Sequence, residues 1–211
     1  MTELILIIVN LCILLWIACR LLSKRSSMPC PAWLSWMVER DNPFTKVTRA
    51  EAIIQHLALH KDMTILDIGC GPGRLTIPIA KQISKNGKIV AMDIQDAMLN
   101  KVRKKADDTN LNNIIYLNAN IANCELENNK FDRILLVSVL GEIPSQDQGI
   151  AVKKIFNALK PGGILSVTET IFDPHFHRCA TVLKLASMAG FQKKDFFGNC
   201  VAYTLNLEKE I

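Results

Sequence analysis

The sequence predicts an α/β fold, in which a doubly wound and mostly parallel sheet of seven strands carries helices on both faces, preceded by one transmembrane helix. Three observations support the α/β prediction. Short apolar runs alternate with amphipathic runs along most of the chain of 211 residues, which is typical of parallel sheets with helical crossovers. Glycines at alternate positions, from Gly69 to Gly73, join the first apolar run to an amphipathic one. Gly198-Asn199 separates the last two strand-like runs, which predicts a hairpin and an antiparallel last strand.

The elements follow from the spacing of apolar residues, which has a period of two in strands and 3.6 in helices. Strands are expected over 63–68, 88–93, 114–118, 131–137, 163–169, 191–197 and 200–208. Helices are expected over 47–60, 73–84, 95–107, 147–160 and 176–189. A polar loop over 119–130 stands where a further helix would otherwise follow the third strand.

An almost wholly apolar segment from Leu4 to Leu22 precedes these elements. Its nineteen residues would span roughly 28 Å as a helix, about the thickness of a bilayer core. The basic residues Arg20, Lys24 and Arg25 follow the segment, which predicts a single-pass membrane protein with its C-terminal side in the cytoplasm. The alternatives are a signal peptide or a buried helix. We therefore expect an anchor over 1–23, a juxtamembrane linker with a short amphipathic helix over 24–46, and one domain over 47–211.

Two prolines, Pro29 and Pro31, separate the anchor from a short apolar run that contains Trp33 and Trp36. Proline ends a preceding helix and can begin a new one. Three interpretations remain open for this run. It could lie at the lipid headgroups, pack against the following domain, or cover a ligand site as a lid.

Composition excludes several function classes. The net charge of +5 is modest, and no basic patch is interleaved with aromatic residues, so nucleic-acid binding is not expected. The basic cluster Lys101-Arg103-Lys104-Lys105 is interpreted as a solvated helix face. Seven cysteines occur without any C-x-x-C pair, which favours reduced thiols in a protein facing the cytosol and predicts no metal site.

The segment Ile65-Leu66-Asp67-Ile68-Gly69-Cys70-Gly71-Pro72-Gly73 predicts a buried strand, a tight turn and then a helix. This arrangement brings the backbone close to a nucleotide-like ligand. Asp93 follows at the end of the next strand, where a carboxylate can accept hydrogen bonds from ribose hydroxyls. A dinucleotide fingerprint would need glycine at position 74, but the chain has Arg74 there, so a nicotinamide-dependent oxidoreductase is disfavoured.

The acidic residue, one apolar residue and G-x-G-x-G pattern instead resembles the first motif of the class I S-adenosylmethionine (SAM) methyltransferases. Three further segments resemble motifs of that family: Val90 to Leu99, Phe131-Asp132-Arg133-Ile134, and Leu159-Lys160-Pro161-Gly162-Gly163. Together they cover residues 62–170 in the order that the family has. The resemblance implies a Rossmann-like, seven-stranded fold, SAM as the cofactor and methyl transfer as the activity.

The resemblance also assigns roles to residues of this chain. Asp67 would orient the methionine amino group, Asp93 would bind both ribose hydroxyls, and Ile94 would lie against adenine. The other residues expected to bind SAM are Gly69, Cys70, Gly71, Gly73, Asn120, Ile121 and Ser138. Asn120 departs from the family, in which many members have an acidic residue at this position. Its amide oxygen can accept the same hydrogen bond from adenine.

The candidate catalytic residues are Glu142 and His175, which follow strands whose carboxyl ends would face the site. Either could accept a proton from the methyl acceptor. Glu142 could instead cap the following turn. The pair His175 and His177 has metal-ligand spacing, but no third ligand accompanies it, so a structural role is favoured.

We expect the acceptor to be small and apolar or lipidic. No Asn-Pro-Pro-Tyr-type segment follows the fourth strand, little sequence remains for a macromolecule-binding domain, and the expected anchor would place the site at a membrane. The segment Gly141-Glu142-Ile143-Pro144 resembles one found in small-molecule methyltransferases related to those acting on quinones. The main alternative is a non-catalytic, membrane-tethered module that binds SAM to scaffold or regulate a partner.

Overall fold

The computed structural model describes residues 30–83 and 86–210, together with positions 3, 6, 7, 10, 11 and 14. The expected transmembrane anchor over 1–23 therefore lies outside the described residues, apart from those six positions. Among the residues that the structure does describe, no helix is both long and apolar enough to cross a membrane.

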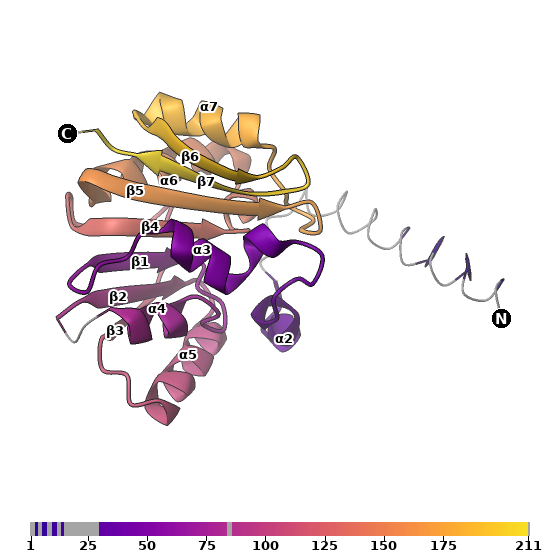
Figure 1. Ribbon diagram of the computed structural model, residues 1–211, viewed down its shortest axis with the longest axis horizontal. Helices are drawn as coiled ribbons and strands as arrows, with labels where there is room; N and C mark the ends of the chain where they lie inside the picture. The colour runs from indigo at the N-terminus through magenta and orange to yellow at the C-terminus, as the bar shows by residue number, and fades with distance from the viewer. Residues whose placement is uncertain are drawn as a thin grey trace.

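Seven strands form one sheet in the order β3-β2-β1-β4-β5-β7-β6 (Figure 1). Their bounds are β1 Thr64–Ile68, β2 Lys88–Asp93, β3 Ile114–Asn118, β4 Phe131–Val137, β5 Leu159–Thr170, β6 Gln192–Gly198 and β7 Ala202–Glu208. The pairs among β1 to β5 are parallel, whereas β7 runs antiparallel to both β5 and β6. The predicted doubly wound sheet with an antiparallel last strand is thus confirmed.

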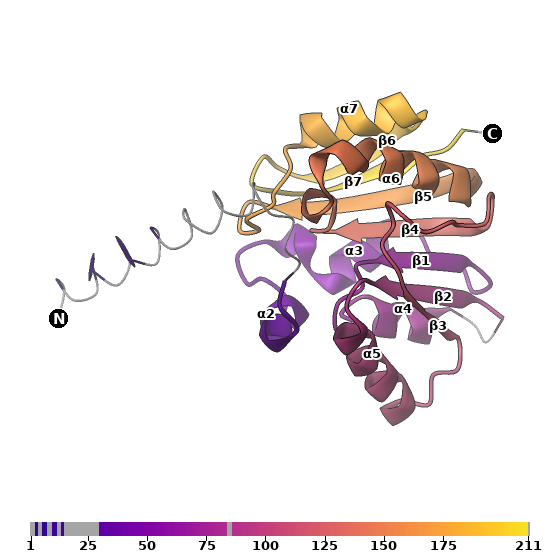
Figure 2. The same cartoon turned by 180° about the vertical axis from the view of Figure 1, so that it is seen from behind.

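Helices cover both faces of the sheet (Figures 1 and 2). The helices are α2 Ser35–Glu39, α3 Ala50–His56, α4 Thr76–Gln82, α5 Asp96–Asp108, α6 Ser145–Ala158 and α7 Cys179–Ala189, with short 3₁₀ turns η1 Ala32–Leu34, η2 Lys46–Thr48 and η3 Leu140–Glu142. Ile65 of β1 packs with α3 and α4, whereas Leu66 and Ile68 belong to the core shared with α6 and α7. Because successive strand residues point to opposite faces, the apolar run of β1 supplies both cores.

Three strands, β2, β3 and β4, have the bounds that the sequence predicts. The predicted boundary between helix 147–160 and strand 163–169 is wrong. The helix α6 ends at Ala158, and β5 begins directly at Leu159. Pro161 cannot extend the helix. Phe131 of β4 pairs with Leu159 of β5, but Arg133 pairs with Ile164, so β5 has more residues than β4 between these two pairs. A register shift at this point accommodates them.

The polypeptide reverses strand order between β1 and β4. From β1 the chain moves outward to β2 and β3, then returns to place β4 on the other side of β1. Ligands of open α/β sheets bind beyond the carboxyl ends of the strands at such a switch point. The loops after β1, β2 and β4 meet there, and α2 lies at the end of the sheet to which the parallel strands point (Figure 1).

Candidate active site

The glycine-rich loop is hydrogen-bonded to the carboxylate of Asp93 at the end of β2. One carboxylate oxygen accepts a hydrogen bond from the Gly71 N–H at 2.9 Å, and the other accepts one from the Gln95 N–H at 2.8 Å. The side chain is largely buried, and burial raises its pKa. Both oxygens keep further lone pairs for a ligand. Asp93 therefore fixes the loop and also lines the adjoining cavity.

The three glycines of the loop serve different purposes, although each has a positive φ. A Cβ on Gly69 would stand 2.4 Å from a methyl group of Val139, so this glycine allows the loop to pack against the segment after β4. A Cβ on Gly73 would crowd Val102 and Ile77. A Cβ on Gly71 would meet nothing within 4 Å, because it would project into the cavity. Of these three glycines, Gly71 is thus the one with open space at its Cα.

The resemblance assigns Asp67 and Cys70 to cofactor binding, but both residues are buried in the protein interior. Asp67 accepts a hydrogen bond from the Thr76 hydroxyl at 2.6 Å, close to the start of α4. Burial raises its pKa to about 6. Cys70 packs in the core against Ala91, Leu99 and Val102. Neither residue is among those that line the cavity, and Gly73 is not among them either.

A cavity of about 170 Å³ opens at the switch point. Seven of the residues singled out from the sequence line it: Gly69, Gly71, Asp93, Ile94, Asn120, Ile121 and Glu142. Ile94 is half exposed, as expected for a side chain that offers an apolar face to a ligand. The side-chain oxygen of Asn120 accepts a hydrogen bond from the Ala122 N–H at 2.9 Å. This bond leaves one lone pair for an incoming donor.

A second and larger cavity of about 600 Å³ adjoins the first, and Cys30, Val38, Val137 and Glu142 line both. Its apolar wall comes from α2 and from the loop after β5. Its polar wall comes from the ends of β4 and β5. The residues that line it are Cys30, Pro31, Leu34, Met37, Val38, Arg40, Asn42, Thr48, Arg74, Val137, Ser138, Glu142, Thr168, Thr170, Phe172, Asp173, Pro174 and His175.

Ser138 belongs to this second cavity and is not among the residues that line the first. It has a φ of 55°, which is rare for a residue other than glycine. Its N–H donates a hydrogen bond to the Thr168 carbonyl oxygen at 2.9 Å. Strained backbone of this kind concentrates at functional sites because the surrounding structure must hold it in place.

Of the two candidate catalytic residues, Glu142 lines both cavities and His175 lines the larger one. Burial raises the pKa of Glu142 to about 7, and the negative charge of Asp173 adds to this shift. The Nδ1 atom of His175 lies 3.6 Å from Asp173 Oδ1, and this interaction raises the pKa of His175. The structure thus brings together a carboxyl group that titrates near neutrality and an imidazole held by a carboxylate.

Gly141 allows this approach, because a Cβ at that position would stand 2.0 Å from the His175 carbonyl oxygen. His177 has a structural role. Its N–H donates to Glu169 Oε2 at 3.1 Å, and its Nε2 lies 3.2 Å from Gln148 Oε1. Among the described residues no group of three or more potential ligands could hold a metal ion.

The segment that contains Trp33 and Trp36 lies over the two cavities. Lys101 of α5 donates hydrogen bonds to the Ala32 carbonyl oxygen at 2.8 Å and to the Ser35 hydroxyl. Lys105 of α5 pairs with Glu39 and also binds the Pro72 carbonyl oxygen of the glycine-rich loop. The interpretation of this basic cluster as a solvated face is therefore wrong for these two lysines. They hold α2 in place.

Arg74 stands where a dinucleotide-binding loop would have glycine. Its guanidinium pairs with Asp41 at 2.8 Å and donates to the Thr48 carbonyl oxygen at 3.0 Å. It thereby fastens the segment after α2 to the glycine-rich loop and lines the larger cavity. The sequence indicated that Arg74 excludes a dinucleotide fingerprint but carried no signal for this structural role.

Sequence reasoning also missed Cys30, Val38 and Gln95 as lining residues of the smaller cavity. Gln95 donates from Nε2 to the Cys30 carbonyl oxygen at 2.9 Å, which fixes the start of the α2 segment. The only available signal was the apolar run itself, which leaves open whether it packs against lipid or protein. In the structure it does pack against the domain, and several of its apolar side chains remain exposed.

Known proteins resemble this chain over the segment that forms most of the smaller cavity. Residues 65–163 match a family described as a methyltransferase domain. A probable methyltransferase of Aspergillus luteorubrus is 31% identical over 140 residues, which is 63% of this chain and 48% of that protein. The ubiquinone/menaquinone biosynthesis C-methyltransferase of Vibrio vulnificus is 32% identical over 114 residues, 52% of this chain and 43% of that protein. The chain thus spans about half the length of these curated relatives.

The fold also resembles that of solved methyltransferases. A SAM-dependent methyltransferase from Aquifex aeolicus superimposes with a TM-score of 0.73 and 18% identity, covering 86% of this chain and all of the other. The segment that matches the methyltransferase family, residues 65–163, contains the glycine-rich loop, Asp93 and Glu142. Together, these matches support a SAM-dependent methyltransferase domain over residues 65–163 with SAM as its cofactor, on a fold shared with solved SAM-dependent methyltransferases.

Proposed function

We propose that this protein transfers the methyl group of SAM to a small apolar or lipidic acceptor by in-line displacement. The observation that carries the proposal is the pair of adjoining cavities. The smaller contains the residues expected to bind the cofactor, the larger is mostly apolar at its outer wall, and Glu142 lines both. A methyl donor in one and an acceptor in the other would be aligned across this shared wall, and alignment is the main contribution of such enzymes.

The residues present fit SAM. Gly71 leaves open space at its Cα, Asp93 offers carboxylate oxygens for ribose hydroxyls, and Ile94 offers an exposed apolar face. When bound, SAM supplies a methyl group activated by a sulfonium. The protein holds the acceptor, excludes water and accepts a proton. Glu142 suits the last task, because a base with a pKa near the working pH is most effective.

The outer wall supports an apolar acceptor that arrives from a lipid surface. Trp33 and Trp36 are 75% and 55% exposed, and Phe44 and Phe172 at the same end are 82% and 50% exposed. The rings of Phe44 and Phe172 lie 6.3 Å apart. We call Trp33, Trp36, Met37, Phe44 and Phe172 the apolar rim. Contiguous exposed apolar surface marks a site of interaction with membranes or partners.

We further propose that the segment over 4–22 anchors the protein in a membrane by a single span, with the methyltransferase domain on the cytoplasmic side. This topology would place the apolar rim close to the headgroup layer, where tryptophan is favoured. The relatives named for ubiquinone and menaquinone biosynthesis support including demethylated quinones among the first acceptors to be tested.

The proposal is tested with the full chain in lipid nanodiscs. Calorimetry should show micromolar binding of SAM and S-adenosylhomocysteine but none of NAD. Labelled SAM should then transfer its methyl group into a membrane lipid extract. Binding of SAM without transfer to any fraction of the extract would favour the alternative, a non-catalytic module that scaffolds or regulates a partner.

A matched pair of variants locates the cofactor site. Asp93→Asn removes a charged acceptor from the cavity, whereas Asp96→Asn changes an exposed carboxylate three residues away. Hydrogen bonds to a charged group contribute about 1.5–3 kcal/mol each, so Asp93→Asn should raise the Kd for SAM by about 100-fold. Asp96→Asn should leave it unchanged. Equal affinity in both variants would contradict the assignment of Asp93.

A further inference from the structure

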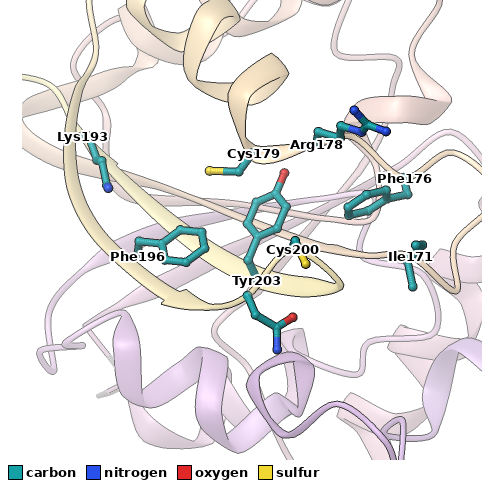
Figure 3. Close-up of a pocket in the computed structure, with 9 residues that line it drawn as sticks. Ile171, Phe176, Arg178, Cys179, Lys193, Phe196, Cys200 and Tyr203 are labelled. Atoms are coloured by element: carbon teal, nitrogen blue, oxygen red, sulfur yellow. The ribbon is translucent and has the colours of Figure 1, made fainter.

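A third cavity of about 700 Å³ lies between the start of α7 and the β6–β7 hairpin (Figure 3). It is lined by Ile171, Phe176, Arg178, Cys179, Lys193, Phe196, Asn199, Cys200 and Tyr203. It shares no lining residue with the two cavities of the methyltransferase site. The loop over 171–178 separates it from the larger of these, because Ile171 and Phe176 line one side and Phe172 and His175 line the other.

Aromatic rings form the floor of this third cavity. The Tyr203 side chain is fully buried, and its hydroxyl donates a hydrogen bond to the His177 carbonyl oxygen at 2.8 Å. The Phe196 ring stacks on that of Tyr203 with centroids 5.9 Å apart, and Phe176 meets Tyr203 edge-on at 6.2 Å. Because hydrogen bonding and packing fix the buried tyrosine, it holds the Phe196 and Phe176 rings in place, and these offer an apolar surface that suits a flat or extended apolar body.

The charge of the cavity is positive. Arg178 and Lys193 lie on opposite sides of the Tyr203 ring (Figure 3), and none of the described lining residues is acidic. The guanidinium of Arg178 has no hydrogen bond or ion pair within the described part of the chain. Only the Arg178 backbone is bonded there, because its carbonyl oxygen accepts hydrogen bonds in the first turn of α7. Arg178 also precedes the first turn of α7, whose N-terminus adds partial positive charge.

We propose that this cavity is a second ligand site, which binds a monoanion with an apolar body, namely an aryl or alkyl carboxylate. The carboxylate pairs with Arg178 beside the first turn of α7, and the apolar body lies against Phe196 and Phe176, whose rings pack on the buried Tyr203. Lys193 contributes attraction from the opposite side. This site is independent of the proposed methyl transfer, so either proposal can fail without the other.

The cysteines provide a readout that locates the ligand. Cys179 and Cys200 line this cavity, Cys30 lines the methyltransferase cavities, and Cys124 lines none of them. The full chain in nanodiscs is treated with N-ethylmaleimide, and the alkylation rate of each cysteine is followed by mass spectrometry. The anions 2-naphthoate and decanoate should each slow alkylation of Cys179 and Cys200 but not of Cys30 or Cys124, and the two probes separate an aryl from an alkyl preference.

Three results would overturn the proposal. These are protection of Cys30 in place of Cys179, no protection at millimolar concentration, and equal protection by the neutral analogue 2-naphthamide. The last would show that charge has no part in binding.

Substitutions then test the charged residues. Arg178→Gln should raise the Kd for 2-naphthoate about fivefold, and Lys193→Gln should raise it about twofold. Lys194→Gln is the matched control, because Lys194 is next in sequence but pairs with Glu208 at 2.8 Å and does not line the cavity. Unchanged SAM affinity shows that each variant is folded. An Arg178→Gln variant that binds 2-naphthoate as tightly as Lys194→Gln would contradict the proposed pairing.

Discussion

Glu142 is the residue at which burial and chemistry are most closely linked. It lines both methyltransferase cavities, and Asp173 and His175 flank it. The backbone of Cys30, at the start of the α2 segment, also donates a hydrogen bond to it. A carboxylate in an open pocket would titrate well below neutrality. Here burial moves its pKa to about 7, so the group can both hold and release a proton at physiological pH.

We expect methyl transfer to follow the ionisation of Glu142. The carboxylate form is the base, so activity should rise with pH through about 7 and fall below it. Glu142→Gln should lower kcat by about 100-fold and remove this limb of the pH profile. SAM affinity should remain within a few-fold of that of the parent protein, as measured by calorimetry.

The control for this prediction is Glu125→Gln, which changes a carboxylate that is 91% exposed. It should keep both kcat and the pH profile of the parent protein. A Glu142→Gln variant that retains the acidic limb would show that another group takes the proton, and His175→Asn would then be the next variant to measure.

At the scale of elements, the α2 segment is held by side chains rather than by an extended apolar core. Lys101, Lys105 and Gln95 contact it from one side, and Arg74 holds the following residues. The helix itself has five residues, too short to be stable alone. We propose that it serves as a lid, which opens when these contacts break.

Loosening this lid should change the KM for the acceptor more than the Kd for SAM. Lys101→Gln removes charge-assisted hydrogen bonds to Ala32 and Ser35, each worth about 1.5–3 kcal/mol, so we expect the KM for the acceptor to rise about tenfold. Lys104→Gln, on the exposed side of α5, is the control and should leave KM unchanged. Steady-state kinetics of both variants check this, and equal KM values would contradict a lid held by Lys101.

The elements also show what the sequence can and cannot predict. The bounds of β2, β3 and β4 follow from short apolar runs that end at polar or turn residues, which is a local property. The roles of Lys101 and Lys105 depend on residues 66 to 69 positions away. No periodicity reports such a contact, so in the sequence a lysine that holds a distant segment resembles a solvated lysine.

The same limit applies within the candidate site. Gly71 and Asp93 could be recognised because their spacing on two neighbouring strands is a motif. The resemblance placed Asp67 and Cys70 in the same motif but could not tell which side chains turn into the core. The positive φ of Ser138 had no local signal, since serine is not a residue type that favours it.

For the whole molecule, the position of the apolar rim over the larger cavity predicts different behaviour in micelles and bilayers. Trp33→Ser combined with Trp36→Ser should lower kcat/KM about tenfold for acceptor embedded in vesicles, because the rim no longer inserts at the headgroups. Activity on detergent-dispersed acceptor should be unchanged. Met188→Ser, which alters a side chain 75% exposed on α7, is the control. Equal losses in vesicles and micelles would contradict docking and indicate a role inside the site.

The whole molecule should also become less stable as pH rises. Burial raises the pKa of Glu169 to about 8, that of Glu142 to about 7 and that of Asp67 to about 6. The folded state therefore retains protons that the unfolded chain releases above pH 4 to 5. A group that binds its proton more tightly when folded contributes stability that is fully present below its unfolded pKa, and this contribution is lost as pH rises through the folded pKa.

Glu169 of β5 is the residue for testing this effect, because it lines neither methyltransferase cavity and has a buried carboxyl oxygen without a hydrogen-bond partner among the described residues. Glu169→Gln keeps an oxygen that can accept the His177 N–H but cannot ionise. Urea midpoints of the parent protein should fall between pH 5.5 and 8.5, and those of the variant should fall less. Glu125→Gln should behave as the parent does. Parallel pH dependence of all three proteins would show that Glu169 ionises as readily in the folded state as in the unfolded chain.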